Sequence, residues 1–285
     1  MSVIVPHYND LERLQSCLAA LCAQTLPHDS FEIVVADNSS PVGLSVVEAA
    51  VAGRARIVVA NERGAGPARN AGVAASRGAI LAFTDCDCMP EPGWLEAGIG
   101  RLASADVVGG RMVVSVGDET SMSGAEAFER VFAFHNHRYI EEKRFTVTAN
   151  LFCSRASFDT IGPFLNGVSE DVEWCHRAIA KGCSLVYEPA AVVAHPARVD
   201  WPQLKRKWRR VNAETYAMEA NGKAGRLRWV ARNLAMPFSI VAHAPKVVAS
   251  PDLPNARARL RALGMLARLR LWRMVDAMRL IRRDR

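Results

Sequence analysis

The sequence predicts an α/β fold, with a mostly parallel, doubly wound sheet and flanking helices, followed by a basic helical region. Over the first 110 residues, short apolar runs alternate with segments of helical periodicity, which is the pattern of repeated β-α-β units. Polar residues gather where the apolar runs end, and open parallel sheets bind their ligands at that edge. Toward the end of the chain this alternation stops and basic residues accumulate.

Four apolar runs are expected to form the parallel strands. They cover residues 3–5, 31–36, 55–60 and 78–84. Each is short and rich in hydrophobic residues, many of them β-branched or aromatic, as buried strands are. Helices are expected over residues 11–21, 42–51 and 64–77, the first because its leucines recur at spacings of three and four.

Two carboxylates follow the fourth run. Asp85 and Asp87 are separated by one residue, so in an extended backbone their side chains point the same way. Paired oxygen ligands at the carboxyl end of a strand suit a Mg²⁺ or Mn²⁺ ion that holds a diphosphate. Taken alone, such a pair is more typical of a solvated turn.

Composition indicates a globular protein, because 50% of the 285 residues are hydrophobic and 23% are charged. The seven cysteines are scattered and none forms a CxxC pair, so we expect neither a zinc site nor a disulfide framework. Cys86 and Cys88 are interpreted as small buried side chains. The chain begins directly with a strand pattern, so we expect no signal peptide and a cytoplasmic location.

Charge is divided unevenly along the chain. Residues 1–200 contain 16 Lys and Arg against 24 Asp and Glu, whereas residues 201–285 contain 20 against 5. The net charges are therefore −8 and +15, which together give the +7 of the whole chain. We expect a catalytic domain over residues 1–200 and a basic helical extension over 201–285 that contacts an anionic partner.

Eight short motifs occur in an order that resembles family 2 glycosyltransferases, over roughly residues 2–200. They are Val-Pro-His-Tyr-Asn at 5–9, Val-Ala-Asp-Asn-Ser-Ser at 35–40, Gly-Ala-Gly-Pro-Ala-Arg-Asn-Ala-Gly at 64–72, Thr-Asp-Cys-Asp at 84–87, Pro-Gly-Trp-Leu at 92–95, Val-Gly-Gly-Arg at 108–111, Thr-Ala-Asn-Leu at 148–151 and Ser-Glu-Asp-Val-Glu at 169–173. Each motif is degenerate, and the resemblance rests on their order.

The resemblance implies a GT-A fold and an inverting transfer of a sugar from a nucleotide-diphosphate donor, with Mn²⁺ or Mg²⁺, in cell-envelope polysaccharide synthesis. The acceptor would be a hydroxyl of a glycan, a lipid-linked saccharide or a small molecule. Two alternatives remain. A sugar-phosphate nucleotidyltransferase would carry a catalytic Lys or Arg just after the first strand, where this chain has residues 7–10, His-Tyr-Asn-Asp. An inactive membrane-associated scaffold would have lost the acidic motifs, which are present here.

The resemblance also assigns donor and metal residues. Asp87 is expected to ligate the metal, Asp85 to contact metal and ribose, and His195 to complete the metal shell. The donor-binding residues are expected to be Pro6, Tyr8, Asn9, Asp37, Asn61, Arg69 and Asp85. His195 follows a strand-like run, so its alternative is a packing role.

Two of these residues have local alternatives. Asp37 resembles the aspartate that recognises the nucleobase, but it can also form an Asx turn or cap the next helix. Arg69 lies in a glycine-rich loop that opens a helix, where it can pair with phosphate or position nearby carboxylates. A surface position for Arg69 is the third interpretation.

Asp171 is expected, by resemblance, to be the base that deprotonates the acceptor, with Glu170 as the second candidate. The alternative is that both acids only cap the helix that begins there. Trp94, Asn150 and Trp174 are expected to face the acceptor, with core packing as the alternative for Trp94.

The basic extension has no such motif. The processive signature Gln-x-x-Arg-Trp is one residue too long here, at 203–208, which disfavours processive polymer synthesis. From Leu260 onward, apolar residues recur at helical spacing among arginines, so this helix is expected to contact an anionic membrane, pack on the catalytic domain or form a homodimer. No nucleic-acid motif is present, and the uncharged run 233–245 is too short to span a bilayer.

Overall fold

The structure, a computed structural model, describes residues 1–283 and divides into two compact units. Unit 1 consists of residues 1–113 and 134–195, and unit 2 of residues 114–133 and the chain from 196 onward. Unit 2 thus takes in a segment from the middle of the chain, which differs from the single division at residue 200 that the sequence suggested.

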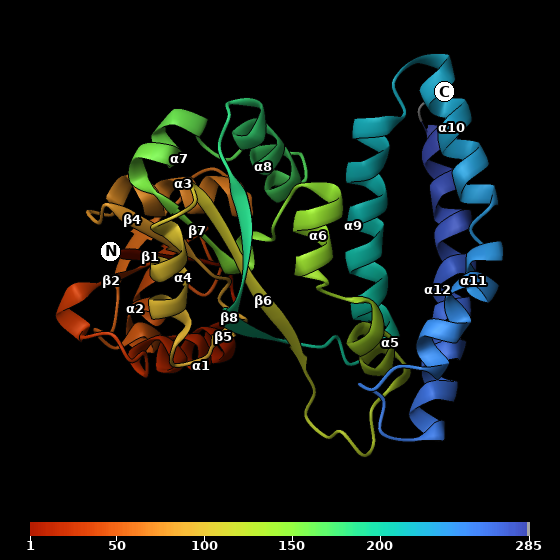
Figure 1. Ribbon diagram of the computed structural model, residues 1–285, viewed down its shortest axis with the longest axis horizontal. Coiled ribbons are helices and arrows are strands. Elements are labelled where there is room, and N and C mark those ends of the chain that lie inside the picture. The colour runs from red at the N-terminus through yellow and green to blue at the C-terminus, as the bar shows by residue number, and fades with distance from the viewer. Residues whose placement is uncertain (284–285) are drawn as a thin grey trace. The chain divides into compact units, whose positions relative to one another are not determined.

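Unit 1 contains one eight-stranded sheet (Figure 1). Its strands are β1 (Ser2–His7), β2 (Glu32–Asp37), β3 (Arg56–Val59), β4 (Ile80–Phe83), β5 (Met89–Pro90), β6 (Val107–Ser115), β7 (Leu151–Ser154) and β8 (Leu185–Pro196), the ends of β6 and β8 lying past the unit boundaries. Its helices are α1 (Leu11–Cys22), α2 (Leu44–Val51), α3 (Ala65–Ala75), α4 (Trp94–Leu102), α6 (Asn136–Lys143), α7 (Arg155–Ile161) and α8 (Glu170–Ala180), with 3₁₀ turns at His28–Ser30 and Thr148–Asn150.

The sheet has the order β3-β2-β1-β4-β7-β6-β8-β5. The first four strands are parallel, which confirms the α/β class and the four predicted strands. β7 then pairs antiparallel with both β4 and β6. Chain order reverses at β1, with β2 on one side and β4 on the other, so their carboxyl ends form the crevice where ligands bind in such sheets.

Two hydrophobic layers hold the sheet of unit 1. On one face, α1, α2 and α4 pack on β1 around Leu14, Val47 and Trp94. On the other face, α3, α7 and α8 pack around Val73, Phe158 and Trp174 (Figure 1). Because both faces are covered, the strands are apolar throughout, and the crevice at their carboxyl ends is left for polar residues.

Replacing Gly110 by Ala is expected to destabilise unit 1 by about 1–3 kcal/mol through overpacking. A Cβ at Gly110, on β6, would lie under 3.0 Å from the carbonyl oxygen of Ala191 and from Oδ1 of Asn150, which is closer than van der Waals contact allows. Gly100→Ala is the matched control, because Gly100 lies inside α4 with nothing within 4 Å of its added Cβ. Thermal melting of the two variants tests this, and equal melting temperatures would contradict it.

Unit 2 is helical and consists of α5 (Gly124–Phe132), α9 (Trp201–Glu219), α10 (Gly222–Leu234), α11 (Phe238–Val248) and α12 (Ala256–Arg283). Its core joins Phe128 of α5 with Leu204 of α9 and with Leu266 and Leu269 of α12. The expected C-terminal helix is present as α12, and the side of it that carries Leu266 and Leu269 is buried inside unit 2, whereas Leu260 and Leu271 are exposed. Over the described residues, none of the helices has the length and hydropathy of a membrane span.

A buried ion cluster lies at the end of α5. Glu129 is 1% exposed and accepts hydrogen bonds from the backbone N–H and Nη1 of Arg198 and from Nζ of Lys207, the last at 2.7 Å. Burial alone would raise the pKa of Glu129, but the two cations outweigh it and the pKa is lowered. Glu129 is therefore a buried carboxylate that ties α5 to the residues around the start of α9.

Candidate functional site

The carboxyl edge of the parallel strands brings together residues from several motifs. β1 ends at His7, β2 ends at Asp37, and Asp85 follows two residues after the end of β4. The N-terminus of α3 begins beside this edge, after the loop that follows β3. The acidic start of α8 is linked to the same edge through one side chain, Arg69.

Arg69 joins two acidic motifs. Its side chain is buried, and it donates to Oδ1 of Asp85 at 2.6 Å through Nη2 and to Oε1 of Glu170 at 2.8 Å through Nη1. Burial opposes the charge, but Asp85 and Glu170 outweigh it and raise the pKa of the guanidinium, which stays charged. Of the three interpretations of Arg69, the structure supports the positioning of carboxylates and excludes the surface position.

Asp171 lies in the first turn of α8, beside Glu170. Its Oδ1 accepts hydrogen bonds from the backbone N–H of Val172 at 2.8 Å and from Oγ of Ser169 at 3.2 Å. Burial raises the pKa of Asp171, and the neighbouring charge of Glu170 raises it further. A carboxylate with increased proton affinity is suited to accept a proton from a substrate.

Asp37 is held in a dense local network. It accepts a hydrogen bond from Nδ1 of His7 at 2.8 Å and from the N–H and hydroxyl of Ser40, at 3.0 and 2.5 Å. Burial alone would raise the pKa of Asp37, but the bonds from Ser40 and His7 lower it overall. Nε2 of His7 accepts from the N–H of Asp10, so Nδ1 carries the proton in the neutral ring. Asp37 therefore holds the turn that follows β2 through Ser40, three residues on, and it does not cap α2, whose N-cap is Gly43.

Asp87, Cys88 and His195 can provide a metal site. Nε2 of His195 lies 3.4 Å from Oδ2 of Asp87, and the candidate ligand atoms of the three residues all lie within 4.8 Å of one another. Ligands lie about 2.0–2.4 Å from the divalent cations that proteins bind, so atoms this close together can share one ion. The donor set of one carboxylate, one imidazole and one thiol fits a divalent transition metal.

Cys88 is a further candidate metal ligand, which the sequence did not reveal. Its thiol is fully buried and lies 3.9 Å from Oδ1 of Asp87. Burial raises the pKa of Cys88 well above its ordinary value, and Asp85 and Asp87 raise it further, so without an ion the sulfur keeps its proton. The side chain is small and buried as expected, but its position next to Asp87 also makes it a third candidate ligand.

The remaining donor candidates lie around the loop between β3 and α3. Tyr8 and Asn9 are exposed after β1, with the guanidinium of Arg63 5.9 Å from the Tyr8 ring centre, and Pro6 is half-buried. Asn61 is exposed in the loop itself. The loop is held by Asn38, which donates to the carbonyl of Glu62 and accepts from the N–H of Gly64, a role that the sequence did not reveal.

The three residues expected to face the acceptor are buried instead. Trp94 and Trp174 are completely covered, and Nε1 of Trp94 donates to Oδ1 of Asn150, also fully buried, at 2.9 Å. Nε1 of Trp174 donates to the carbonyl of Gly162 at 2.9 Å. Because an acceptor cannot reach covered side chains in this conformation, Trp94, Asn150 and Trp174 are core residues, as the alternative for Trp94 proposed.

The family model described as glycosyl transferase family 2 matches residues 2–162. Glycosyltransferase AglE of Haloferax volcanii is 35% identical over 220 residues, 73% of this chain and 71% of that protein. The pre-mycofactocin glycosyltransferase of Mycobacterium tuberculosis is 32% identical over 152 residues, half of this chain and 32% of that protein.

Solved structures agree with the fold. The mannosyltransferase PcManGT from Pyrobaculum calidifontis, in complex with GDP-Man and Mn²⁺, superposes with a TM-score of 0.59 at 18% identity, covering 97% of this chain and 85% of that one. GalNAc-T7 with UDP, GalNAc and Mn²⁺ gives a TM-score of 0.55 at 18% identity, over 74% of this chain and 47% of that one. The fold is therefore of the GT-A type, and together with the family match it shows that this chain belongs to glycosyl transferase family 2.

Proposed function

We propose that unit 1 is an inverting glycosyltransferase that moves a sugar from a nucleotide diphosphate to an acceptor hydroxyl. The observation that carries this proposal is the buried bridge from Asp85 through Arg69 to Glu170. It holds Asp85, which follows β4, and Glu170, in the first turn of α8, against one cation. A donor site and a proton acceptor held together in this way are what a direct displacement requires.

Asp171 is the proposed base. It accepts the proton of the acceptor hydroxyl, while the acceptor oxygen forms a bond to the anomeric carbon on the face opposite the diphosphate. The bond from that carbon to the diphosphate oxygen breaks in the same displacement, so the configuration inverts. The increased pKa of Asp171 supports this role, because a base must compete for the hydroxyl proton.

Asp87 and His195 are the proposed metal ligands, with Cys88 beside them. Asp85 is proposed to contact metal and ribose. A divalent ion there would offset the charge that develops on the departing diphosphate. Arg69 keeps Asp85 in place for this contact. The solved neighbours that contain Mn²⁺ with GDP-Man or with UDP support a nucleotide-sugar donor and a Mn²⁺ or Mg²⁺ cofactor.

The acceptor is proposed to be a glycan, a lipid-linked saccharide or a small molecule, in cell-envelope polysaccharide synthesis. The basic composition of unit 2 supports a site at the cytoplasmic face of an anionic membrane, as a peripheral protein. Tyr8, Asn9 and Asn61 are exposed near the carboxyl edge and are proposed to contact the donor, together with Pro6 and Asp37.

A thermal-shift panel of nucleoside diphosphates and nucleotide sugars tests the donor site. With Mn²⁺ or Mg²⁺ and ligand at about a hundred times its Kd, the melting temperature should rise by about 5–10 °C, because the ligand stabilises only the native state. Chelator should remove most of the rise, and Asp87→Ala should behave like chelator.

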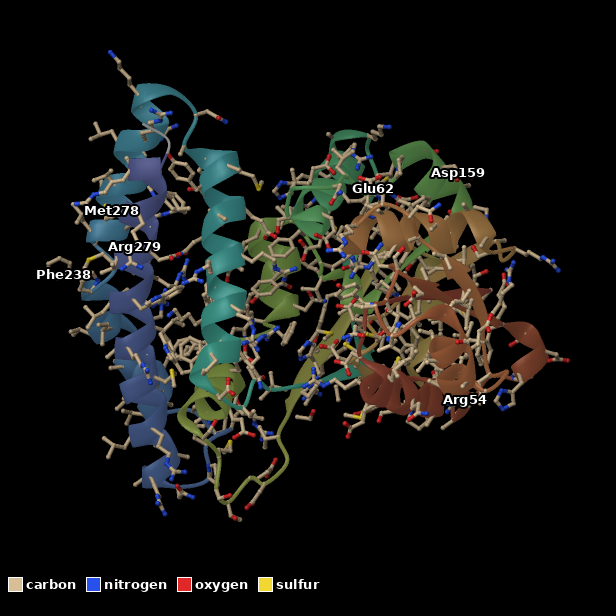
Figure 2. All side chains as sticks on the ribbon, turned by 180° about the vertical axis from the view of Figure 1, so that it is seen from behind. Arg54, Glu62, Asp159, Phe238, Met278 and Arg279 are labelled. Carbon is tan, nitrogen blue, oxygen red and sulfur yellow. The ribbon has the colours of Figure 1, made fainter. Side chains whose placement is uncertain are left out.

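The control is Asp159→Ala, which removes an exposed carboxylate from α7 (labelled in Figure 2) and should keep the full shift. If no nucleotide shifts the parent with either metal, the donor site is absent and an inactive transferase fold becomes the better description.

A further inference from the structure

The outward face of α11 in unit 2 is apolar and uncovered. Phe238, Val241 and Val248 are 78%, 77% and 58% exposed, and Leu234 at the end of α10 is 54% exposed. Phe238, Val241, Pro245 and Val248 recur at intervals of three, four and three residues, so their side chains lie along one side of the helix. Phe238 extends away from its helix in Figure 2. We call these four residues and Leu234 the α11 face.

The opposite side of α11 already has its partners. Val247 is fully buried in the core that joins α5 and α12. His243 packs edge-on against Phe132, and Nζ of Lys246 lies 5.2 Å from the centre of the same ring. The helix is therefore anchored through one side, and the exposed apolar residues of the α11 face are not needed for its packing within unit 2.

The helix for which the sequence left membrane contact, packing and dimer formation open, α12, packs through one side. Ala262, Leu266, Leu269 and Ala277 form the apolar side of α12, and all four are fully buried. This side of α12 is covered and is not available to a membrane, while the exposed apolar residues of the helix, Leu260, Leu271 and Val275, are 71%, 47% and 44% exposed, each less than Phe238 or Val241. The two most exposed large apolar residues of unit 2, Phe238 and Val241, lie instead on α11, whose sequence shows no amphipathic charge pattern of its own.

The segment that contains the α11 face is basic, and exposed cations occur on the two helices that precede and follow it. Residues 220–251 contain five Lys and Arg residues and no Asp or Glu. Lys223, Arg226 and Arg228 are exposed on α10, and Arg257 is exposed at the start of α12. Apolar residues bordered by basic ones are the composition of surfaces that lie in a lipid interface, where the apolar side enters the acyl boundary and the cations meet anionic headgroups.

We propose that the α11 face is the surface through which this protein docks on an anionic lipid bilayer. Charge complementarity favours this occupant over a second copy of the chain, because two copies meeting here would bring two basic stretches together. The helix lies in the membrane surface and does not cross it, because α11 has 11 residues. This docking is independent of the reaction that unit 1 performs.

Sedimentation of the full chain with vesicles tests the proposal. The chain should bind vesicles with about 30% phosphatidylglycerol at least tenfold more tightly than vesicles of phosphatidylcholine alone, since each cation near the surface contributes about fivefold. The double variant Phe238→Ser/Val241→Ser should lose at least tenfold in affinity for the anionic vesicles, because it removes the two most exposed apolar side chains of α11.

The matched control is Leu271→Ser/Val275→Ser, which removes two exposed apolar residues from α12 and should bind like the parent. Equal binding by the parent and the Phe238/Val241 variant overturns the proposal, and so does loss of binding in the control alone. A parent that dimerises through α11, measured by sedimentation velocity, and ignores vesicles also overturns it. The nucleotide thermal shift of each variant is measured separately, so failure to dock is distinguished from failure of the donor site.

Discussion

Asp171→Asn is expected to lower kcat for sugar transfer by about 10²–10⁴-fold, which is the usual contribution of a positioned general base. Asparagine keeps the size of the side chain and its ability to accept from the N–H of Val172, so α8 should remain folded. It cannot accept a proton from the acceptor. Donor binding, measured by the nucleotide thermal shift, should be unchanged, because Asp171 does not contact Arg69 through a hydrogen bond while Glu170 does.

The pH dependence of the parent provides a second readout. Asp171 has a raised pKa, and it must be ionised to act, so the rate should increase with pH through a pKa above the ordinary aspartate value of about 3.9. The Asp171→Asn variant should lack this acidic limb. Glu173→Gln is the control, because Glu173 lies on the same helix and pairs with Arg177. A control variant as slow as Asp171→Asn, or a fast Asp171→Asn enzyme, would remove Asp171 from the mechanism.

Glu129→Gln is expected to reduce the free energy of unfolding of unit 2 by about 3–5 kcal/mol. The substitution leaves Arg198 and Lys207 without the buried carboxylate that both contact, and an uncompensated buried charge is costly. Burial lowers the pKa of Lys207, and Glu129 opposes this shift, so the substitution removes the group that favours the charged lysine. Denaturant unfolding followed through unit 2 tryptophans measures the change.

Glu219→Gln is the matched control in the same unit. Glu219 pairs with Arg232, but both side chains are largely exposed, so its loss should change stability by less than about 1 kcal/mol. Lowering the pH should decrease the contribution of Glu129 to the stability of the folded state. Because its folded pKa is lowered, its contribution is present above the ordinary glutamate pKa and is lost as the pH falls through the folded value. Equal stability of the two variants would contradict the ion-cluster argument.

The parallel half of the sheet was predictable because its signals are local. Apolar runs, helical leucine spacing and polar strand ends each depend on neighbouring residues, and β1, β2, β3 and β4 appear where these signals place them. The antiparallel pairing of β7 with β4 was not predictable in this way. It joins residues 151–154 to residues 80–83, and nothing in either segment specifies the partner or its direction.

The candidate site was predictable to the extent that its motifs are contiguous. Asp85, Asp87 and Asp171 were found from short motifs, and the structure brings His195 close to Asp87. The link through Arg69 depends on two segments 101 residues apart, so only the fold could distinguish a carboxylate-positioning role from a phosphate contact. Trp94 was misassigned because an aromatic residue after an acidic motif has the same sequence signal whether it is buried or exposed.

The interleaved chain of unit 2 limits how this protein can be shortened. Residues 114–133 leave unit 1 at the end of β6, form α5, and return before α6, so cutting after residue 200 keeps α5 and removes every helix that covers it. Met122, Phe128 and Val131, all buried against α9 and α12 in the full chain, would then face water. A minimal catalytic fragment therefore requires two changes, a C-terminal stop and a short linker in place of residues 114–133.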